Sequence, residues 1–188
     1  MIITLREVFD IIAMTLLVGV IFSSFFRFLK KQKYNPLEVK AGIDWESMKM
    51  AIIITAPGIL FHELGHKFAA LGFGIEATFH ASYFWLMIGV ILSLMNTGII
   101  FFIPAYVSIA SSATPLQNTI ISFAGPFVNL LLYVMSFLLL RYNLVKRKNV
   151  PLVLLTKRIN GFLFLFNMIP IPPFDGSHVL LGLYHIFF

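Results

Sequence analysis

Two histidines and a glutamate are spaced so that one helix would carry them together. They lie in the pentapeptide His62-Glu63-Leu64-Gly65-His66. Because each residue advances a helix by ~100°, His62 and His66 leave the axis about 40° apart on one face. Two imidazoles in this arrangement can bind one metal ion, and a glutamate beside them can take a proton from an attacking water. The pentapeptide therefore predicts a metal site with a general base.

The surrounding sequence is too apolar for a soluble protein. Of its 188 residues, 59% are hydrophobic and 12% are charged, whereas soluble domains carry roughly 25% charged residues. Ionisable side chains inside a bilayer are costly, so they indicate function by default. We therefore expect an integral membrane protein in which the pentapeptide binds zinc for hydrolysis within the membrane.

The remaining metal ligand must come from elsewhere in the chain. A catalytic zinc usually takes three protein ligands and one water. The chain has no cysteine, so the ligand must be a histidine, an aspartate or a glutamate. After Glu76 the only acidic residue is Asp175. We therefore favour Asp175, with His80, His178 and His185 as alternatives.

The basic residues lie in two short stretches, 30–40 and 141–158, beside apolar runs. The net charge of +6 would suit nucleic acid if it were gathered on one surface. Its placement beside apolar runs is instead typical of membrane topology. We expect a multi-pass protein of the cell membrane that has the lipid bilayer as a partner and binds no nucleic acid.

Apolar runs of about 20 residues predict helices that cross a bilayer core of ~30 Å. The chain contains three such runs and the start of a fourth, at 8–29, 50–71, 116–140 and 159–168. Pro57-Gly58 predicts a kink in the second run, and Gly72-Phe73-Gly74 predicts its end. The prolines of 170–173 lack a backbone donor and end the fourth. We expect extended backbone over 170–174 and a short helix over 177–188.

The stretch between the second and third runs has a different pattern. Apolar and polar residues alternate over 75–83, and residues 98–109 are rich in β-branched and aromatic side chains, so both read as strands. A short apolar helix over 84–94 would lie between them. The fold class is thus mainly α, a polytopic membrane helix bundle with a small membrane-associated β-sheet, in a single membrane-embedded domain over 1–188.

Helix geometry also predicts the depth of the candidate ligands. Counting ~1.5 Å per residue from Lys49, His62 and His66 lie roughly 20–25 Å along their run. Counting from Arg158, Asp175 lies about 25 Å along the fourth. The two basic stretches belong to one side of the membrane, because two runs separate them. The two histidines and the late carboxylate are therefore expected at similar depth.

Three motifs occur in this order along the chain. They are the pentapeptide 62–66, then Gly125-Pro126-Phe127-Val128-Asn129, and then the segment 167–176, which begins with Asn167 and ends with Asp175-Gly176. Together they resemble the site-2 protease family of intramembrane zinc metalloproteases, from about residue 50 to the end of the chain. Phe174 stands where that family usually has Leu, and Ser177 stands where a second Gly is frequent. Neither departure changes a candidate ligand.

The resemblance implies a role for each motif residue. It makes His62, His66 and Asp175 the ligands of Zn²⁺, and Glu63 the general base. It makes Asn129 and Asn167 candidates for binding the unwound backbone of the substrate. The partner would be a membrane-tethered protein whose transmembrane helix is cut, and the edge of the small sheet could take up an extended substrate as a strand.

The sequence disfavours two other functions and leaves a third open. A membrane metalloprotease that uses a downstream Glu as third ligand is disfavoured because no Glu follows Glu76. A transporter would be expected to show inverted repeats, and none is visible. A metal-binding scaffold without turnover stays open. Orientation stays open too, because the positive-inside rule places both basic stretches in the cytoplasm, opposite to the family's usual arrangement.

Overall fold

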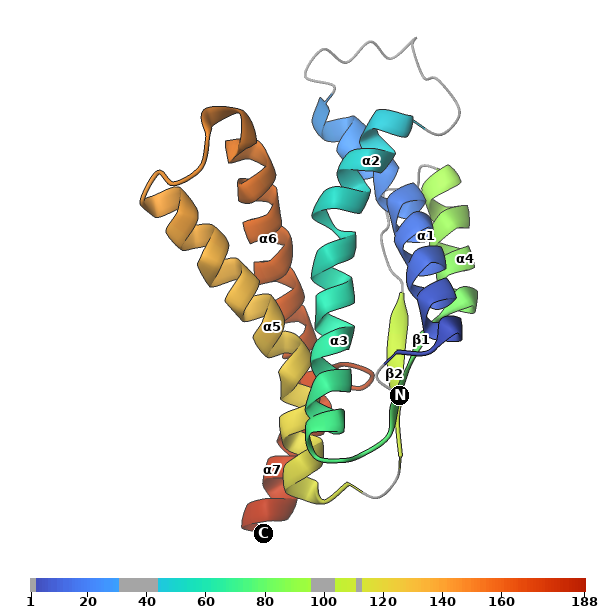
Figure 1. The fold of residues 1–188 in the computed structure, drawn as a ribbon, viewed down its shortest axis with the longest axis vertical. Helices are drawn as coiled ribbons and strands as arrows, with labels where there is room; N and C mark the ends of the chain where they lie inside the picture. Colours follow the sequence, from blue (N-terminus) through green and yellow to red (C-terminus); the bar gives the residue numbers. More distant parts are fainter. Residues whose placement is uncertain (1–2, 31–43, 96–103, 111–112) are drawn as a thin grey trace. The chain divides into compact units, whose positions relative to one another are not determined.

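The computed structural model describes residues 3–30, 44–95, 104–110 and 113–188 (Figure 1). Helices dominate this part of the chain, which also contains one pair of β-strands. The mainly α fold class with a small sheet is therefore confirmed. In chain order the elements are α1 (Leu5–Lys30), α2 (Trp45–Ile54), α3 (Ala56–Gly72), β1 (Ala77–Ala81), α4 (Tyr83–Leu94), β2 (Ala105–Ile109), α5 (Pro115–Arg141), a 3₁₀ turn (Arg147–Asn149), α6 (Val150–Asn167) and α7 (Asp175–Phe187).

Four helical segments of the described chain are long and apolar enough to cross a membrane, namely Leu5–Phe26, Trp45–Gly72, Pro115–Arg141 and Arg147–Asn167. Little of their apolar surface is covered by the protein itself. Over an apolar 18-residue stretch of each segment, only 22% of the α5 residues and 6% of the α6 residues are buried inside the fold. Apolar surface of this extent is unfavourable in water but suits lipid. The chain is thus a membrane protein, as predicted.

Contacts divide the chain into two compact units. The first unit comprises Met1–Pro57 and His80–Tyr106, and the second comprises Gly58–Phe79 and Val107–Phe188. The single domain expected over 1–188 stays a prediction.

In the first unit, α1 packs against α2 and α4. A Cβ atom at Gly19 would lie 2.5 Å from Ile52 Cγ1, so the glycine permits α1 and α2 to approach closely. Ser93 Oγ of α4 donates to the backbone oxygen of Ile21 at 2.9 Å. The Tyr83 hydroxyl donates to Asp10, and this hydrogen bond raises the pKa of Tyr83.

In the second unit, α5 packs against both α6 and α7. Its N-terminus is fixed by a capping box, in which Thr114 Oγ1 accepts from Gln117 N and Gln117 Oε1 accepts from Thr114 N. Pro115 follows at the first helical position, where its missing N–H costs nothing. A buried apolar cluster lies where α3 and α5 meet the sheet, formed by Ala70, Ile75, Ala77 and Ile121.

The second span is interrupted near the position of the predicted kink, and it ends where predicted. Helix α2 ends at Ile54 and α3 begins at Ala56, so the interruption lies beside Pro57. At the other end, Gly74 adopts φ +74°, a left-handed conformation that favours glycine. Gly74 N bonds Leu71 O and Ile75 N bonds Ala70 O, which is a Schellman motif. This motif ends α3 within nine residues of His66 and leads the chain into β1.

The two strands pair in antiparallel fashion. Ala110 N donates to Glu76 O at 3.1 Å, and Ser82 N donates to Pro104 O at 3.1 Å. This register places His80 opposite Tyr106, and their rings stack with centroids 5.2 Å apart. Strand β1 agrees with the predicted alternation over 75–83. Of the strand predicted over 98–109, residues 105–109 are β2, and 98–103 lie outside the described residues.

Two boundaries predicted near the C-terminal third are wrong. Helix α6 begins at Val150 rather than at 159, so part of the predicted basic loop is helical. Lys157 tolerates this position because its Nζ lies 5.8 Å from the ring centre of Tyr133 and 5.1 Å from that of Phe137. Helix α7 begins at Asp175 rather than at 177.

The segment between α6 and α7 is non-helical, as the prolines predicted, but it is not extended. Ile171 N donates to Ile169 O at 2.9 Å, and Phe174 N donates to Ile171 O at 3.0 Å. The backbone therefore forms successive turns. The physical reason is that the φ angle fixed by proline is compatible with turns as well as with extended backbone.

Candidate metal centre

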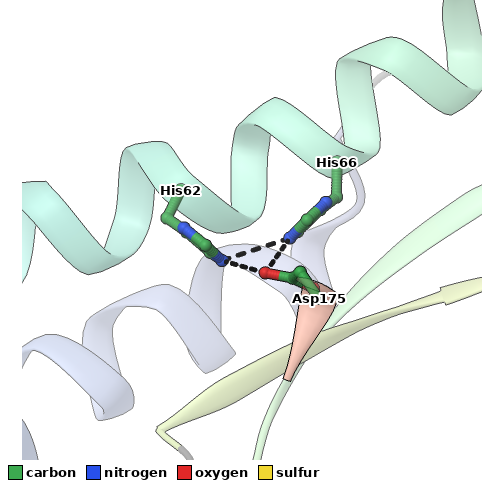
Figure 2. Close-up of side chains that lie close together, drawn as sticks. All are labelled: His62, His66 and Asp175. Atoms are coloured by element: carbon green, nitrogen blue, oxygen red, sulfur yellow. Dashed lines mark hydrogen bonds and ion pairs between the residues drawn. The ribbon is translucent and has the colours of Figure 1, made fainter. Parts of the chain in front are cut away.

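Two histidines and one aspartate meet in the second unit (Figure 2). His62 and His66 lie one turn apart on α3, and Asp175 is the first residue of α7. The Nε2 atoms of the two histidines are 3.2 Å apart. Asp175 Oδ2 lies 3.0 Å from His62 Nε2 and 3.4 Å from His66 Nε2. Within the described part of the chain, these three residues form the group of side chains arranged to hold one metal ion.

The other nitrogen of each imidazole is hydrogen-bonded to an oxygen. His62 Nδ1 lies 2.7 Å from Asn129 Oδ1, and His66 Nδ1 lies 2.7 Å from the backbone oxygen of Ile121. Because an oxygen of this kind accepts, each Nδ1 carries a proton, and in the neutral imidazole each Nε2 then presents a lone pair. Metal-binding histidines in proteins are commonly oriented in this way.

With both imidazoles neutral, three electron-rich atoms face one another, and a cation between them would remove their mutual repulsion. The atoms are His62 Nε2, His66 Nε2 and Asp175 Oδ2, separated by 3.0–3.4 Å. Neighbouring ligands of a tetrahedral zinc, each ~2.0–2.1 Å from the ion, lie about 3.3–3.4 Å apart. The donor set of two imidazoles and a carboxylate also suits zinc. The residues present thus fit a zinc ion.

Glycines allow α5 to lie directly against the two histidines. A Cβ atom at Gly125 would collide with His66 Nε2 and Cε1 and would lie 2.9 Å from His62 Nε2. A Cβ atom at Gly65 would lie 2.9 Å from the backbone oxygen of Ala124. Each position therefore requires a residue without a side chain. The Gly of each motif serves the approach of α3 to α5.

Asp175 reaches the histidines because α7 begins against the end of α6. A Cβ atom at Gly176 would collide with the backbone of Met168 and would lie 2.8 Å from Ile169 O. Only glycine allows the first turn of α7 to approach that close. The Asp-Gly pair is therefore one structural unit, in which the aspartate supplies the oxygen and the glycine sets its position.

Glu63 lies beside the two histidines on α3 and is 8% exposed. Its side chain leaves the helix ~100° from that of His62, so it flanks the pair without lying between them. The close contacts that join His62, His66 and Asp175 do not include its carboxylate. This side chain is thus able to accept a proton from a water or a substrate group.

The structure places the two predicted substrate-binding asparagines differently. Asn129 is 0% exposed, and its amide bonds His62, Gly58 O and Asn160 Oδ1. Asn167 is half-buried at the end of α6, where its Nδ2 donates to Leu163 O at 3.0 Å. Substrate binding by either residue stays a prediction. Asn129 is occupied by protein partners in this structure.

The alternative third ligands have other positions. His80 stacks on Tyr106 in the sheet, whereas His178 and His185 are exposed on α7. None of them belongs to the group that surrounds the candidate metal position in the described chain.

Sequence reasoning missed one buried polar residue connected to the site. Asn160 of α6 is 1% exposed and accepts from Asn129 Nδ2. The signal that could have revealed it was an amide inside an apolar helix, between Ile159 and Gly161. The predicted boundary of the fourth run at 159 placed this residue in the first turn of a helix, where an asparagine is ordinary.

Comparisons with known proteins agree with this geometry. The model of the family described as "Peptidase family M50" matches residues 50–146, which include both histidines and Asn129. A curated protein of Methanocaldococcus jannaschii, named "Putative zinc metalloprotease MJ0611", is 37% identical over 70% of this chain and 69% of its own length. Another, of Synechocystis and named "Putative zinc metalloprotease sll0528", is 28% identical over 76% of this chain and 33% of its own length. No solved structure matches.

The names of both relatives specify zinc, the cofactor that the sequence predicted. The family model covers the pentapeptide and the Gly-Pro motif but ends before Asp175, so the third candidate ligand is supported by geometry alone. The extent of the family match and the identity to the archaeal relative lead to one conclusion: this chain belongs to peptidase family M50.

Proposed function

We propose that this chain is a zinc metalloprotease of the cell membrane that hydrolyses peptide bonds in the transmembrane segments of membrane-tethered proteins. The observation that carries the proposal is the meeting of two imidazole lone pairs with one carboxylate oxygen, 3.0–3.4 Å apart. Two of these residues belong to an apolar segment long enough to span a bilayer. A peptidase site at that depth has transmembrane segments as its natural substrates.

The proposed ligands of the zinc ion are His62, His66 and Asp175. Bound there, zinc would supply a Lewis acid that polarises a carbonyl group and lowers the pKa of water. The hydrogen bonds to Asn129 and Ile121 hold the imidazoles in the tautomer that this role requires.

Glu63 is proposed as the general base. Its carboxylate accepts a proton from the attacking water and passes it to the amine that leaves when the peptide bond breaks. Glu63 suits this task because it lies next to the ligands but is not part of the group that they form.

The substrate must be unwound before it is cut, because a helix engages each carbonyl group in a hydrogen bond. We propose that an extended segment is bound in two ways. One is by addition to an edge of the two-stranded sheet. The other is by Asn167, whose side chain is half-buried just before the non-helical segment 168–174. Asn129 is the weaker candidate for this contact because its amide is fully bonded within the protein.

The substitution Glu63→Gln tests the proposal. The purified variant in detergent or liposomes should bind zinc like the parent protein but lose cleavage of a model transmembrane substrate by at least ~10²–10⁴-fold, the usual contribution of a general base. Zinc content is measured by elemental analysis and cleavage by gel mobility.

The control His66→Ala should lose both zinc and cleavage. Zinc-containing parent protein that cuts no transmembrane substrate would favour a metal-binding scaffold. Undiminished turnover in Glu63→Gln would overturn the proposed role of Glu63.

A further inference from the structure

Asn160 is a buried polar residue on the apolar helix α6. It is 1% exposed, although most of α6 is not covered by the protein. Its Nδ2 donates to Thr156 O at 2.9 Å, and its Oδ1 accepts from Asn129 Nδ2 at 3.0 Å. A Cβ atom at Gly58 would lie 3.1 Å from Asn160 Oδ1, so α3 also lies against this amide. An amide is costly to bury unless its hydrogen bonds are made, and these bonds connect it to the histidine helix.

Backbone carbonyl groups fix the direction of this chain of hydrogen bonds. Thr156 O can only accept, so the end of the Asn160 amide that faces it is the NH₂ group. The oxygen of Asn160 must then face Asn129. Gly58 O, 2.9 Å from Asn129, likewise requires the NH₂ group of that amide. Two acceptors therefore hold the Asn129 NH₂ group, and its oxygen is directed at the imidazole of His62.

The direction of the Asn129 amide decides which nitrogen of His62 has a free lone pair. With the oxygen facing Nδ1, the proton is on Nδ1 and the lone pair of Nε2 is directed toward Asp175. If the amide were turned by 180°, its NH₂ group would face Nδ1. Nδ1 would then have to accept, the proton would move to Nε2, and His62 could no longer bind a metal through that atom.

We propose that Asn160 is a positioning residue that acts through Asn129 to hold His62 in its metal-binding tautomer. The path runs from α6 through α5 to α3, within the second unit. This inference rests on the proposed function, because it requires that His62 is a zinc ligand. Asn160 touches neither of the candidate ligand nitrogens, and its effect is exerted on the orientation of a neighbouring amide.

The test compares three variants of the full chain in detergent. Asn160→Leu removes the acceptor at similar volume. Asn160→Asp retains an oxygen where Asn129 needs an acceptor. Thr119→Val is the matched control, because Thr119 is also buried and also donates to the carbonyl four residues earlier, at 2.8 Å, without contact to the candidate ligands. Zinc affinity is measured by competition with a chelator, and thermal unfolding is measured on the zinc-free protein.

Asn160→Leu should weaken zinc binding several-fold, less than the about 10–100-fold that follows loss of a residue bonded directly to a metal-binding histidine, because Gly58 O still accepts from Asn129. Asn160→Asp should stay within a few-fold of the parent, and Thr119→Val should be unchanged. Parental zinc affinity in Asn160→Leu overturns the proposal. Equal losses in both Asn160 variants also overturn it. If Asn160→Leu does not fold, Asn160→Ala, which also removes the acceptor, replaces it, with loss of affinity expected and parental affinity overturning the proposal.

Failure of the proposed function has a different signature. In that case the parent protein binds no zinc, or binds it independently of His66 and Asp175. Failure of the inference about Asn160 alone leaves a parent protein that binds zinc through those residues. Adding Co²⁺ in place of Zn²⁺ gives a second readout, because the absorption bands of Co²⁺ report its ligand geometry and should change in Asn160→Leu only.

Discussion

At Gly125, the absence of a single methyl group leaves room for two imidazole rings. A Cβ atom there would collide with His66 Nε2, the atom proposed to bind the metal. The neighbouring Pro126 also lies inside α5, where it cannot donate to the carbonyl four residues earlier. Gly125 thus has a local task at the centre, independent of any contact with a substrate.

We predict that Gly125→Ala lowers zinc affinity by more than tenfold, because the new methyl group displaces the histidine nitrogens. Gly19→Ala is the matched control, since its Cβ atom would lie 2.5 Å from Ile52 Cγ1 in the first unit, which contains none of the candidate ligands. That control should lose about 1–3 kcal/mol of stability by overpacking but retain zinc. Chelator competition and thermal unfolding measure the two effects, and equal zinc affinity in the two variants would contradict this reading of Gly125.

Residues were predictable from the sequence where chemistry restricts the choice. Asp175 is the only acid after Glu76, and a zinc site without cysteine takes its ligands from histidine and carboxylate side chains. The hydrogen bond from His66 to Ile121 O could not be predicted, because every residue has a carbonyl group and side-chain identity says nothing about which one will accept. The role of Asn160 could not be predicted either, because it depends on which side chain of the neighbouring helix donates to its oxygen.

At the scale of elements, the junction between α6 and α7 controls where Asp175 lies. The chain leaves α6 at Asn167, forms turns and enters α7 with the aspartate as its first residue. A carboxylate at a helix N-terminus is favoured by the helix dipole. The position of the third candidate ligand is therefore a property of two helix ends and of the turns between them.

Gly176→Ala should move the start of α7, and Asp175 with it, away from the end of α6. The added methyl group would collide with the backbone of Met168, which cannot rotate away as a side chain can. We expect zinc affinity to fall at least tenfold while the membrane helices still form. Ser177→Ala is the control, because it loses a 2.7 Å hydrogen bond to Phe174 O in the same turn but adds no atom. Circular dichroism checks helicity, and the prediction fails if both variants bind zinc as the parent does.

The existence of most elements followed from run length and periodicity, whereas their ends did not. The alternation over 75–83 predicted β1, and the glycines around Phe73 predicted the end of α3. The start of α6 could not be predicted, because basic residues such as Lys157 and Arg158 are compatible with a loop as well as with a helix. Charge does not exclude a helix when a long side chain can place its cation over aromatic rings, as Lys157 does.

For the whole molecule, zinc binding and folding should be coupled. The candidate ligands come from α3 and α7, so an ion that binds both helices stabilises the folded state only. Free zinc at 100 times its dissociation constant should raise the free energy of unfolding by about 2.7 kcal/mol. Thermal unfolding of the chelated and the zinc-loaded protein measures this.

The variants His66→Ala and Asp175→Ala provide the controls for that experiment. Neither should show a zinc-dependent change in unfolding temperature at the same zinc concentration. A full shift in either variant would mean that the ion stabilises the protein from another place.

The two histidines differ in what holds them. His66 is oriented by a main-chain oxygen, Ile121 O, and His62 by the side chain of Asn129. A main-chain oxygen is retained through any substitution that leaves the helix intact. Substitutions at position 121 therefore do not remove the acceptor that orients His66. Variation at Asn129 and Asn160 acts on His62 alone. The strength of metal binding can therefore be adjusted through one histidine while the other stays constant, which makes the face of α5 and α6 behind His62 the place to engineer zinc affinity.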